Sequence, residues 1–164
     1  MKSYCLLEHL SASEIIRKEL FEITGREFTP KQLRGRDIDE NQAALVSGFN
    51  KLKLHTRVPL VLDAHTVIDK GEVLEAIKPS VFAAFNFDLL VCLTASPEQI
   101  KSQRSNDKTR KRPKLSIENI KRNQNVSNRV AIEIGTSLGI PILTLMAGDE
   151  EKLAKIIYPR YLPL

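Results

Sequence analysis

The chain has 164 residues, 42% of them hydrophobic and 27% charged, which excludes two large domains, a disordered chain and a fibrous one. Its net charge of +5 has a local source, because residues 101–122 hold nine basic and two acidic residues and the rest is mildly acidic. No apolar run approaches the roughly 18–20 residues of a membrane span and no signal peptide is recognisable, so we expect a cytoplasmic protein without a membrane partner.

Short apolar runs predict the strands. Three of them, residues 58–63, 88–94 and 140–146, are rich in Val, Ile and Leu and lack polar alternation, as strands covered on both faces do. Residues 4–10 form a weaker fourth candidate. Stretches with helical periodicity separate these runs, so the predicted order is β-α-α-β-α-β-α-β-α. This order predicts an α/β fold, a parallel sheet flanked by helices, in a single domain over residues 1–164.

Capping residues predict where the helices begin and end. Ser11 to Glu14 fits a capping box, and Gly25 fits the end of that helix. Ser96-Pro97-Glu98 places a cap, a first-turn proline and an acid after the second apolar run. A long helix is predicted over 116–138, closed by Gly139, and a final amphipathic helix over 149–157.

The cysteine and aromatic content narrows the classes of ligand. Cys5 and Cys92 lie in apolar runs and belong to no CxxC or Cys/His cluster, which favours buried free thiols over a disulfide and predicts no structural zinc site. With no Trp and nine aromatic residues, a stacking platform for single-stranded nucleic acid is poorly supported, and we do not expect a nucleic-acid partner.

The apolar run over residues 58–63 delivers a carboxylate and an imidazole at its carboxyl end, Asp63 and His65. Ligands of open α/β sheets bind at that edge, and an Asp there commonly anchors Mg²⁺ or its waters. The alternative is that Asp63 caps a turn and His65 packs beneath a loop.

The segment from His9 to Arg17 is predicted to turn from a strand into a helix. Ser11 and Ser13 supply hydroxyls there, the helix start supplies unpaired N–H groups, and Arg17 lies one turn further on. Such a turn attracts phosphate. The alternative is an ordinary capped helix with a solvated arginine.

A third cluster is basic and spans residues 101–129. Guanidinium groups suit multiply charged phosphates, and Pro113 predicts a loop between two helices, so residues 104–115 form a candidate lid over phosphates. A solvated basic face or an electrostatic nucleic-acid patch would explain the same charges. The candidate binding residues of this cluster are Arg104, Arg110, Arg112, Arg122, Gln124, Asn128 and Arg129.

A fourth cluster precedes and opens a helix. Its candidate ligands for a second phosphate or a base edge are Arg34, Arg36, Asn41 and Gln42. A polar loop with an aspartate cap is the alternative.

Taken in order, these four pieces resemble the adenylate-kinase-like branch of P-loop nucleotide kinases, with the closest likeness to archaeal-type adenylate kinases and the related AAA-type ATPase branch. The likeness spans residues 9–157. It implies ATP and Mg²⁺ as cofactors and transfer of the γ-phosphate to a nucleotide, with Asp63 organising Mg²⁺. It also implies acceptor contacts by Ser11, Ser13, Arg17 and Arg36, and stabilisation of the transferring charge by Arg104, Arg110, Arg112 and Arg129.

The resemblance fails at its start. The family opens with a strand, a glycine-rich loop ending in Gly-Lys-Ser/Thr, and a helix, whereas only eight residues precede His9 here. The family's central strand is therefore expected to be absent, and activity to be weak or lost. Three arrangements would close the gap: residues 4–10 move in, the flanking strands pair directly, or a second copy or partner chain donates a strand. A truncated start is a further explanation. The competing functional hypothesis is a noncatalytic nucleotide-binding or scaffold protein completed by such a partner.

Overall fold

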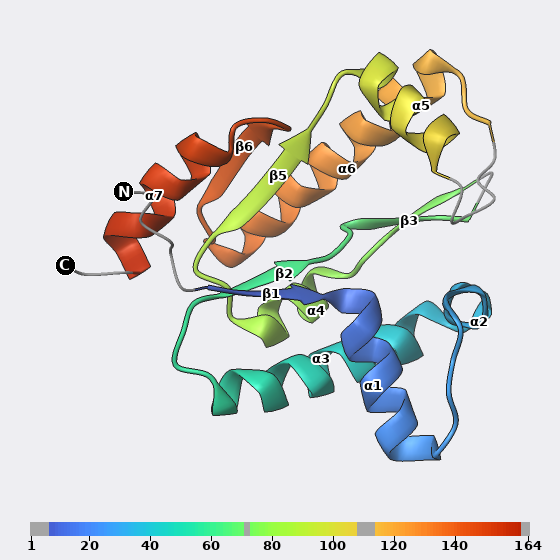
Figure 1. Cartoon of the computed structure of the whole chain (residues 1–164), viewed down its shortest axis with the longest axis vertical. Helices are drawn as coiled ribbons and strands as arrows, with labels where there is room; N and C mark the ends of the chain where they lie inside the picture. The colour runs from blue at the N-terminus through green and yellow to red at the C-terminus, as the bar shows by residue number, and fades with distance from the viewer. Residues whose placement is uncertain (1–6, 71–72, 108–113, 162–164) are drawn as a thin grey trace. The chain divides into compact units, whose positions relative to one another are not determined.

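A computed structural model describes residues 7–70, 73–107 and 114–161 of the chain (Figure 1). Their contacts divide them into two units. The first takes the chain up to Ala64, the segment Ser80–Asn86 and the chain from Ile157 onward, and the second takes His65–Pro79 and Phe87–Ile156. Within the described residues, no helix is both long and apolar enough to span a membrane.

The first unit is built on one pair of parallel strands. β1 (Glu8–Ser11) runs beside β2 (Leu60–Asp63), and three helices lie between them in the sequence. These helices are α1 (Ala12–Thr24), α2 (Pro30–Gly35) and α3 (Ile38–His55). α1 packs on α3 at Gly48, where an added Cβ would lie 2.7 Å from the Cγ2 of Ile15. Phe49 of α3 meets Phe85 of α4 (Pro79–Phe85) edge to face, with 5.2 Å between the ring centroids.

The helix starts of the first unit differ in how they are capped. Thr29 and Gln32 form a reciprocal capping box at α2, and the carboxylate of Asp37 accepts the N–H of Glu40 at α3. The capping box predicted at Ser11 is wrong, because the Ser11 side chain makes no cap hydrogen bond. Its hydroxyl lies 3.0 Å from that of Ser13 instead.

The second unit holds two strand pairs packed on a long helix. β3 (Val67–Asp69) and β4 (Leu74–Ala76) form an antiparallel hairpin, while β5 (Leu90–Thr94) and β6 (Ile142–Met146) run parallel. α6 (Ile117–Leu138) contacts all four strands, and α5 (Pro97–Asn106) packs against it. α7 (Glu150–Tyr161) begins in this unit. The Thr66 hydroxyl donates to the Ser127 carbonyl over 3.1 Å, which ties the start of the hairpin to α6.

The predicted α/β class with parallel strands and flanking helices is confirmed. The three strong apolar runs all form strands, and the described end of the weak candidate lies in β1 (Glu8–Ser11), while residues 4–6 lie outside the described residues. The run 58–63 forms β2, which pairs with β1 in the first unit, and the run 88–94 forms β5, which pairs with β6 in the second. The prediction that both faces of these strands are covered is wrong at Leu93 of β5, whose exposed fraction is 67%. Cys92 is a buried free thiol as expected, and burial raises its pKa, whereas Cys5 lies outside the described residues.

Candidate functional site

The carboxyl edge of the β1–β2 pair brings a hydroxyl and a carboxylate together. Ser11 and Asp63 end their strands and are direct register partners. α1 begins at the next residue after Ser11, so its unpaired N–H groups point toward the same edge. Asp63 is exposed, and the second hydroxyl, that of Ser13, lies 3.0 Å from the Ser11 oxygen. Ser11, Ser13 and Asp63 thus lie at one edge of the first unit, and their roles as ligands stay predictions.

The oxygens at this edge suit a magnesium ion. Mg²⁺ is usually held by one or two carboxylates and keeps several waters and substrate oxygens, which matches one exposed aspartate beside two hydroxyls. No group of three or more His, Cys, Asp or Glu side chains in the described part of the chain could hold a metal by itself. Asp63 therefore fits a site that nucleotide phosphates complete.

Arg17 extends this edge along α1. It lies four residues after Ser13, which makes the two side chains neighbours on the helix surface. Its Nε donates to the carbonyl of Phe28 over 2.9 Å, so the guanidinium is held in place from the segment that follows α1. A hollow of about 230 Å³ adjoins it. Six residues line this hollow: Glu14, Arg17, Lys18, Phe21, Glu27 and Phe28.

In the cluster around α2 and α3, Arg36 and Asn41 already contact other groups of the chain, which the sequence alone does not indicate. Arg36 donates to Glu40 over 2.5 Å, and its guanidinium lies 5.0 Å from the centre of the Phe28 ring. Asn41 donates to the carbonyl of Leu33 over 2.8 Å. The Nε of Arg36 and the Oδ1 of Asn41 are buried and find no hydrogen-bond partner among the residues that the structure describes. Arg34 is exposed and Gln42 is half-buried, and substrate contact by this cluster stays a prediction.

In the second unit, Gln124 holds the segment that follows β5. Its Oε1 accepts the N–H of Ala95 over 3.0 Å, and its Nε2 donates to the carbonyl of the same residue over 3.1 Å. Both ends of the amide are thus used to position backbone, and substrate binding by Gln124 stays a prediction. Asn128 is half-buried one turn further along α6, and His65 is exposed at the start of this unit.

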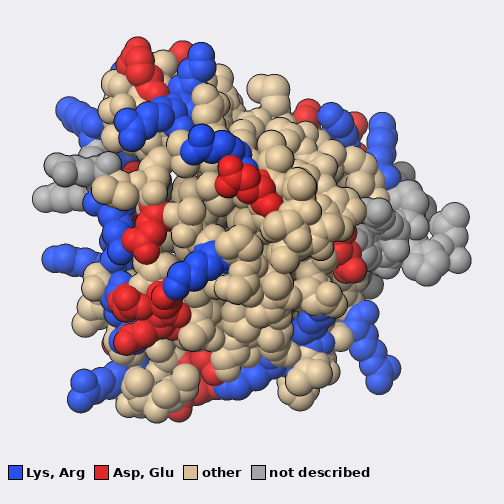
Figure 2. Space-filling view, turned by 180° about the vertical axis from the view of Figure 1, so that it is seen from behind, with Lys and Arg blue, Asp and Glu red and all other residues tan. Residues whose placement is uncertain are grey.

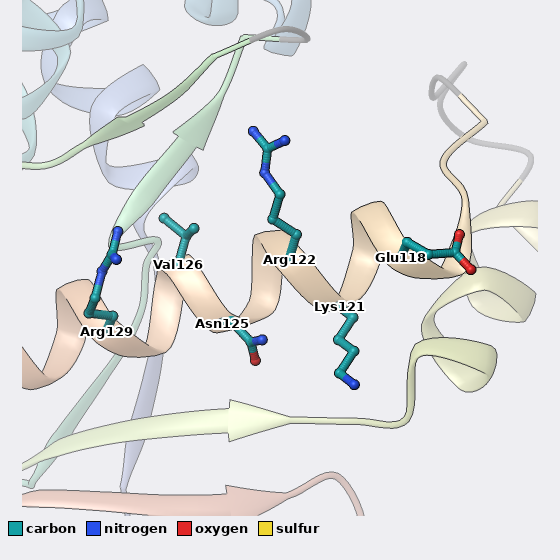
Figure 3. Close-up of a pocket in the computed structure, with 6 residues that line it drawn as sticks. All are labelled: Glu118, Lys121, Arg122, Asn125, Val126 and Arg129. Atoms are coloured by element: carbon teal, nitrogen blue, oxygen red, sulfur yellow. The ribbon is translucent and has the colours of Figure 1, made fainter.

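A second hollow, of about 400 Å³, lies along α6 (Figure 3). Its lining residues are Glu118, Lys121, Arg122, Asn125, Val126 and Arg129. Figure 3 shows Arg122 and Arg129 extending from the helix on the same side as Val126. Arg129 also lies 3.8 Å from Glu133 in an exposed pair. The sequence predicts both arginines as candidate binding residues, and their helical spacing with Val126 places them on one face; binding by them stays a prediction.

The acidic member of this hollow stays ionised. Hydrogen bonds from its own backbone and from the Ser116 hydroxyl, together with the charge of Lys101, hold the pKa of Glu118 below its usual range. Charges of both signs therefore line the hollow. Figure 2 shows the same mixing on the face it displays, where Lys and Arg are interspersed with Asp and Glu.

The predicted lid over residues 104–115 is described only in part. Arg104 lies in the last turn of α5. Arg110 and Arg112 fall in 108–113, outside the described residues, so their roles stay predictions.

Comparison with known proteins identifies the family. No curated protein matches the chain. A family model described as AAA domain matches residues 2–121, which is more than half of the sequence. This family has the P-loop NTPase-like fold of nucleotide-binding, kinase-type proteins, in agreement with the α/β architecture. The chain therefore belongs to the AAA domain family.

Proposed function

We propose that the protein binds ATP with Mg²⁺ and transfers the γ-phosphate to a nucleotide, as nucleoside monophosphate kinases do. The observation that carries this proposal is the pairing of Ser11 with Asp63 at the strand edge where α1 begins. That edge combines a metal-binding carboxylate with hydroxyls and N–H groups that suit phosphate. We place the activity in the cytoplasm, where a free buried thiol such as Cys92 persists.

Each charged group has a part in this proposal. Asp63 holds the waters and phosphate oxygens of Mg²⁺, and Ser11, Ser13 and Arg17 hold the acceptor phosphate. Arg122 and Arg129, on one face of α6, neutralise charge on the phosphates of ATP, together with Arg104 and the arginines at 110 and 112. Phosphoryl transfer depends on positioning and charge neutralisation and needs little covalent chemistry from the protein.

The proposal includes slow turnover by these 164 residues. They contain no glycine-rich loop ending in Gly-Lys-Ser or Gly-Lys-Thr. That loop supplies the backbone cradle and the lysine for the β-phosphate in P-loop enzymes, and losing such donors costs several powers of ten in rate.

The test combines calorimetric binding of ATP and Mg²⁺ with a coupled assay for ADP. We expect Asp63→Ala to weaken Mg²⁺-dependent ATP binding at least tenfold. Asp88→Ala is the matched control, because Asp88 is also exposed but precedes β5, at the amino end of a strand. Equal ATP binding by the wild type and Asp63→Ala would overturn the assignment of Asp63, and fast turnover by the chain would overturn the expected impairment.

One observation favours a second candidate, a noncatalytic nucleotide-binding protein completed by another strand. Among the described residues, β2 and β5 each have one pairing partner within their own unit, and neither strand's apolar core carries the charge or proline that blocks further pairing. This candidate predicts ATP binding without turnover together with a homodimer or a complex with a partner chain. Light scattering after size exclusion tests it, and a strict monomer that hydrolyses or transfers phosphate would rule it out.

A further inference from the structure

The hollow along α6 is lined by one helix alone. Its six residues, from Glu118 to Arg129, recur at spacings of three and four, so they form one continuous stripe of the helix surface, here called the α6 stripe. At the rise of an α-helix this stripe is about 16 Å long. A ligand that contacts all of it is therefore elongated, as a helix or an extended chain is, whereas a compact ion meets only part of it.

The charges of the α6 stripe favour an acidic ligand. Three of its side chains are basic and one is acidic. The Arg122 guanidinium forms no ion pair within the described part of the chain. Arg129 lies 3.8 Å from Glu133, but both side chains are largely exposed, so this pair contributes little and can be exchanged for another. Both arginines are thus available to the carboxylates of a partner.

The two flanks of the α6 stripe differ in character. Figure 3 shows Arg122, Val126 and Arg129 extending to one flank, and Lys121 and Asn125 to the other. Val126 is half-buried and lies between the two arginines, which are two helical turns and about 10 Å apart. A facing helix matches this flank when it carries acids at i and i+7 and an apolar residue at i+3 between them.

Glu118 distinguishes a protein helix from a nucleic acid as the ligand. Its pKa lies below the usual range, so it places a negative charge at one end of the α6 stripe and repels a phosphate backbone there. The lining also contains no aromatic residue on which a base could stack. A partner helix can instead place a basic residue opposite Glu118. If it runs antiparallel to α6, its acids lie toward its own amino end and this base toward its carboxyl end, as the helix dipole favours.

We propose that the α6 stripe docks an acidic amphipathic helix of a partner protein, antiparallel to α6, with one carboxylate on Arg122, one on Arg129 and an apolar side chain on Val126. The inference goes beyond the proposed function and shares only the two arginines with it. Exposed ion pairs are weak individually, so the docked helix is expected to exchange readily and to be released by salt.

The experiment uses a synthetic helical peptide as the probe. The peptide is built on alanine and carries Glu at i and i+7, Leu at i+3 and Lys at i+11, and fluorescence anisotropy measures its binding to the full chain at low ionic strength. A peptide of the same composition, with its two acids on opposite faces of the helix, is the control. We expect the designed peptide to bind about fivefold more tightly than this control, and severalfold less tightly when the ionic strength rises from about 0.05 to 0.3 M.

Charge reversal in the protein tests which residues the peptide meets. Arg122→Glu is expected to weaken binding about fivefold or more, because it replaces an attraction by a repulsion. Lys152→Glu is the matched control, since Lys152 is exposed on α7, outside the α6 stripe, and undergoes the same change of charge. A peptide with Lys in place of both acids is expected to restore binding to the double variant Arg122→Glu/Arg129→Glu. Both arginines are exposed, and thermal unfolding will verify that the variants are folded.

Three results would each overturn the proposal: equal binding of the designed and control peptides, equal effects of Arg122→Glu and Lys152→Glu, or tighter binding of a single-stranded RNA oligonucleotide than of the peptide. If one of them occurs while ATP binding still depends on Asp63, the docking surface is wrong and the proposed function stands. ATP is expected to displace the peptide, because both use the same arginines. A peptide that binds as designed but is not displaced by ATP would leave the docking surface standing and overturn the assignment of these arginines to ATP.

Discussion

Ser11 and Asp63 are the last register partners of two parallel strands, and the side chain of Ser11 does not cap the helix that it precedes. A serine at a helix N-cap ordinarily spends its hydroxyl on the second or third N–H of the helix. Here that hydroxyl lies against Ser13 instead, at the carboxyl edge of the strands where Asp63 also lies. The proposed contribution of Ser11 to binding can therefore be tested apart from a contribution to stability.

The first prediction uses this separation. Ser11→Ala is expected to change the free energy of unfolding by less than about 0.5 kcal/mol, because no cap hydrogen bond is lost. Ser96→Ala is the matched comparison, since its hydroxyl accepts the N–H of Gln99 over 3.2 Å, and it is expected to cost about 1 kcal/mol. Urea unfolding followed by circular dichroism measures both. Equal losses from the two variants would contradict the cap geometry.

The second prediction concerns the amide of Gln124, which holds both backbone groups of Ala95. Gln124→Ala leaves this N–H and carbonyl without their partner and is expected to cost about 1–3 kcal/mol. Gln124→Glu keeps the acceptor but replaces the donor by an oxygen that faces a carbonyl, so a loss of similar size is expected. Asn125→Ala, the exposed neighbour, serves as the control and should leave unfolding nearly unchanged. If Gln124→Ala also proves neutral, the amide does not stabilise this segment.

Sequence patterns correctly predict those helix ends that are fixed by the conformation or capping of a few local residues. Gly25 and Gly139 end α1 and α6 in the left-handed conformation, each with φ of 66°, which favours glycine. Ser96 followed by Pro97 starts α5 as predicted. These signals depend only on neighbouring residues, so the sequence is enough to predict where these helices begin or end.

The features that the sequence does not predict depend on contacts between residues that are far apart in the chain. The β3–β4 hairpin has strands of three residues each, too short for a periodic signal, and it is held to α6 through Thr66 and Ser127. Arg17 was predicted as a phosphate ligand, but its anchoring by the carbonyl of Phe28, eleven residues away, follows only from the fold. Phe21 lies off the apolar stripe of α1, so its place in the lining of the hollow beside Arg17 follows only from the fold.

The third prediction tests the contact between α6 and β6. A Cβ at Gly135 would overlap the side chain of Ile142 and lie 3.1 Å from the Ile140 carbonyl. Gly135→Ala is therefore expected to destabilise the protein by about 1–3 kcal/mol, even though alanine favours helix by about 1 kcal/mol. Gly35→Ala is the control, since nothing lies within 4 Å of its Cβ position, and it should be neutral or stabilising. A stabilised Gly135→Ala variant would show that the Ile142 side chain can move aside at little cost in free energy.

The fourth prediction concerns the ion pair that joins α1 to α3. Glu19 is 4% exposed, and its two carboxylate oxygens each lie 2.8 Å from the Lys51 ammonium. Burial alone would raise the pKa of Glu19, but hydrogen bonds from Lys51 and Ser47 and the charge of Lys51 outweigh it and lower the pKa below its ordinary 4.5. Glu19→Gln removes the charge on these bonds and is expected to cost about 1–3 kcal/mol near pH 7.

The pH dependence of this loss follows from the direction of the shift. The pKa of Glu19 is lower in the folded than in the unfolded chain, so its ionisation stabilises the fold at every pH above about 4.5. That contribution is lost as the pH falls through the folded pKa below 4.5. The difference in unfolding free energy between wild type and Glu19→Gln should therefore be constant from pH 6 to 8 and shrink in acid. Glu22→Gln is the control, because Glu22 meets the same ammonium at 3.2 Å but is exposed, and its effect should be small at every pH. Chemical unfolding from pH 3 to 8 measures these differences, and a Glu19→Gln effect that grows in acid would show that the folded pKa is raised instead.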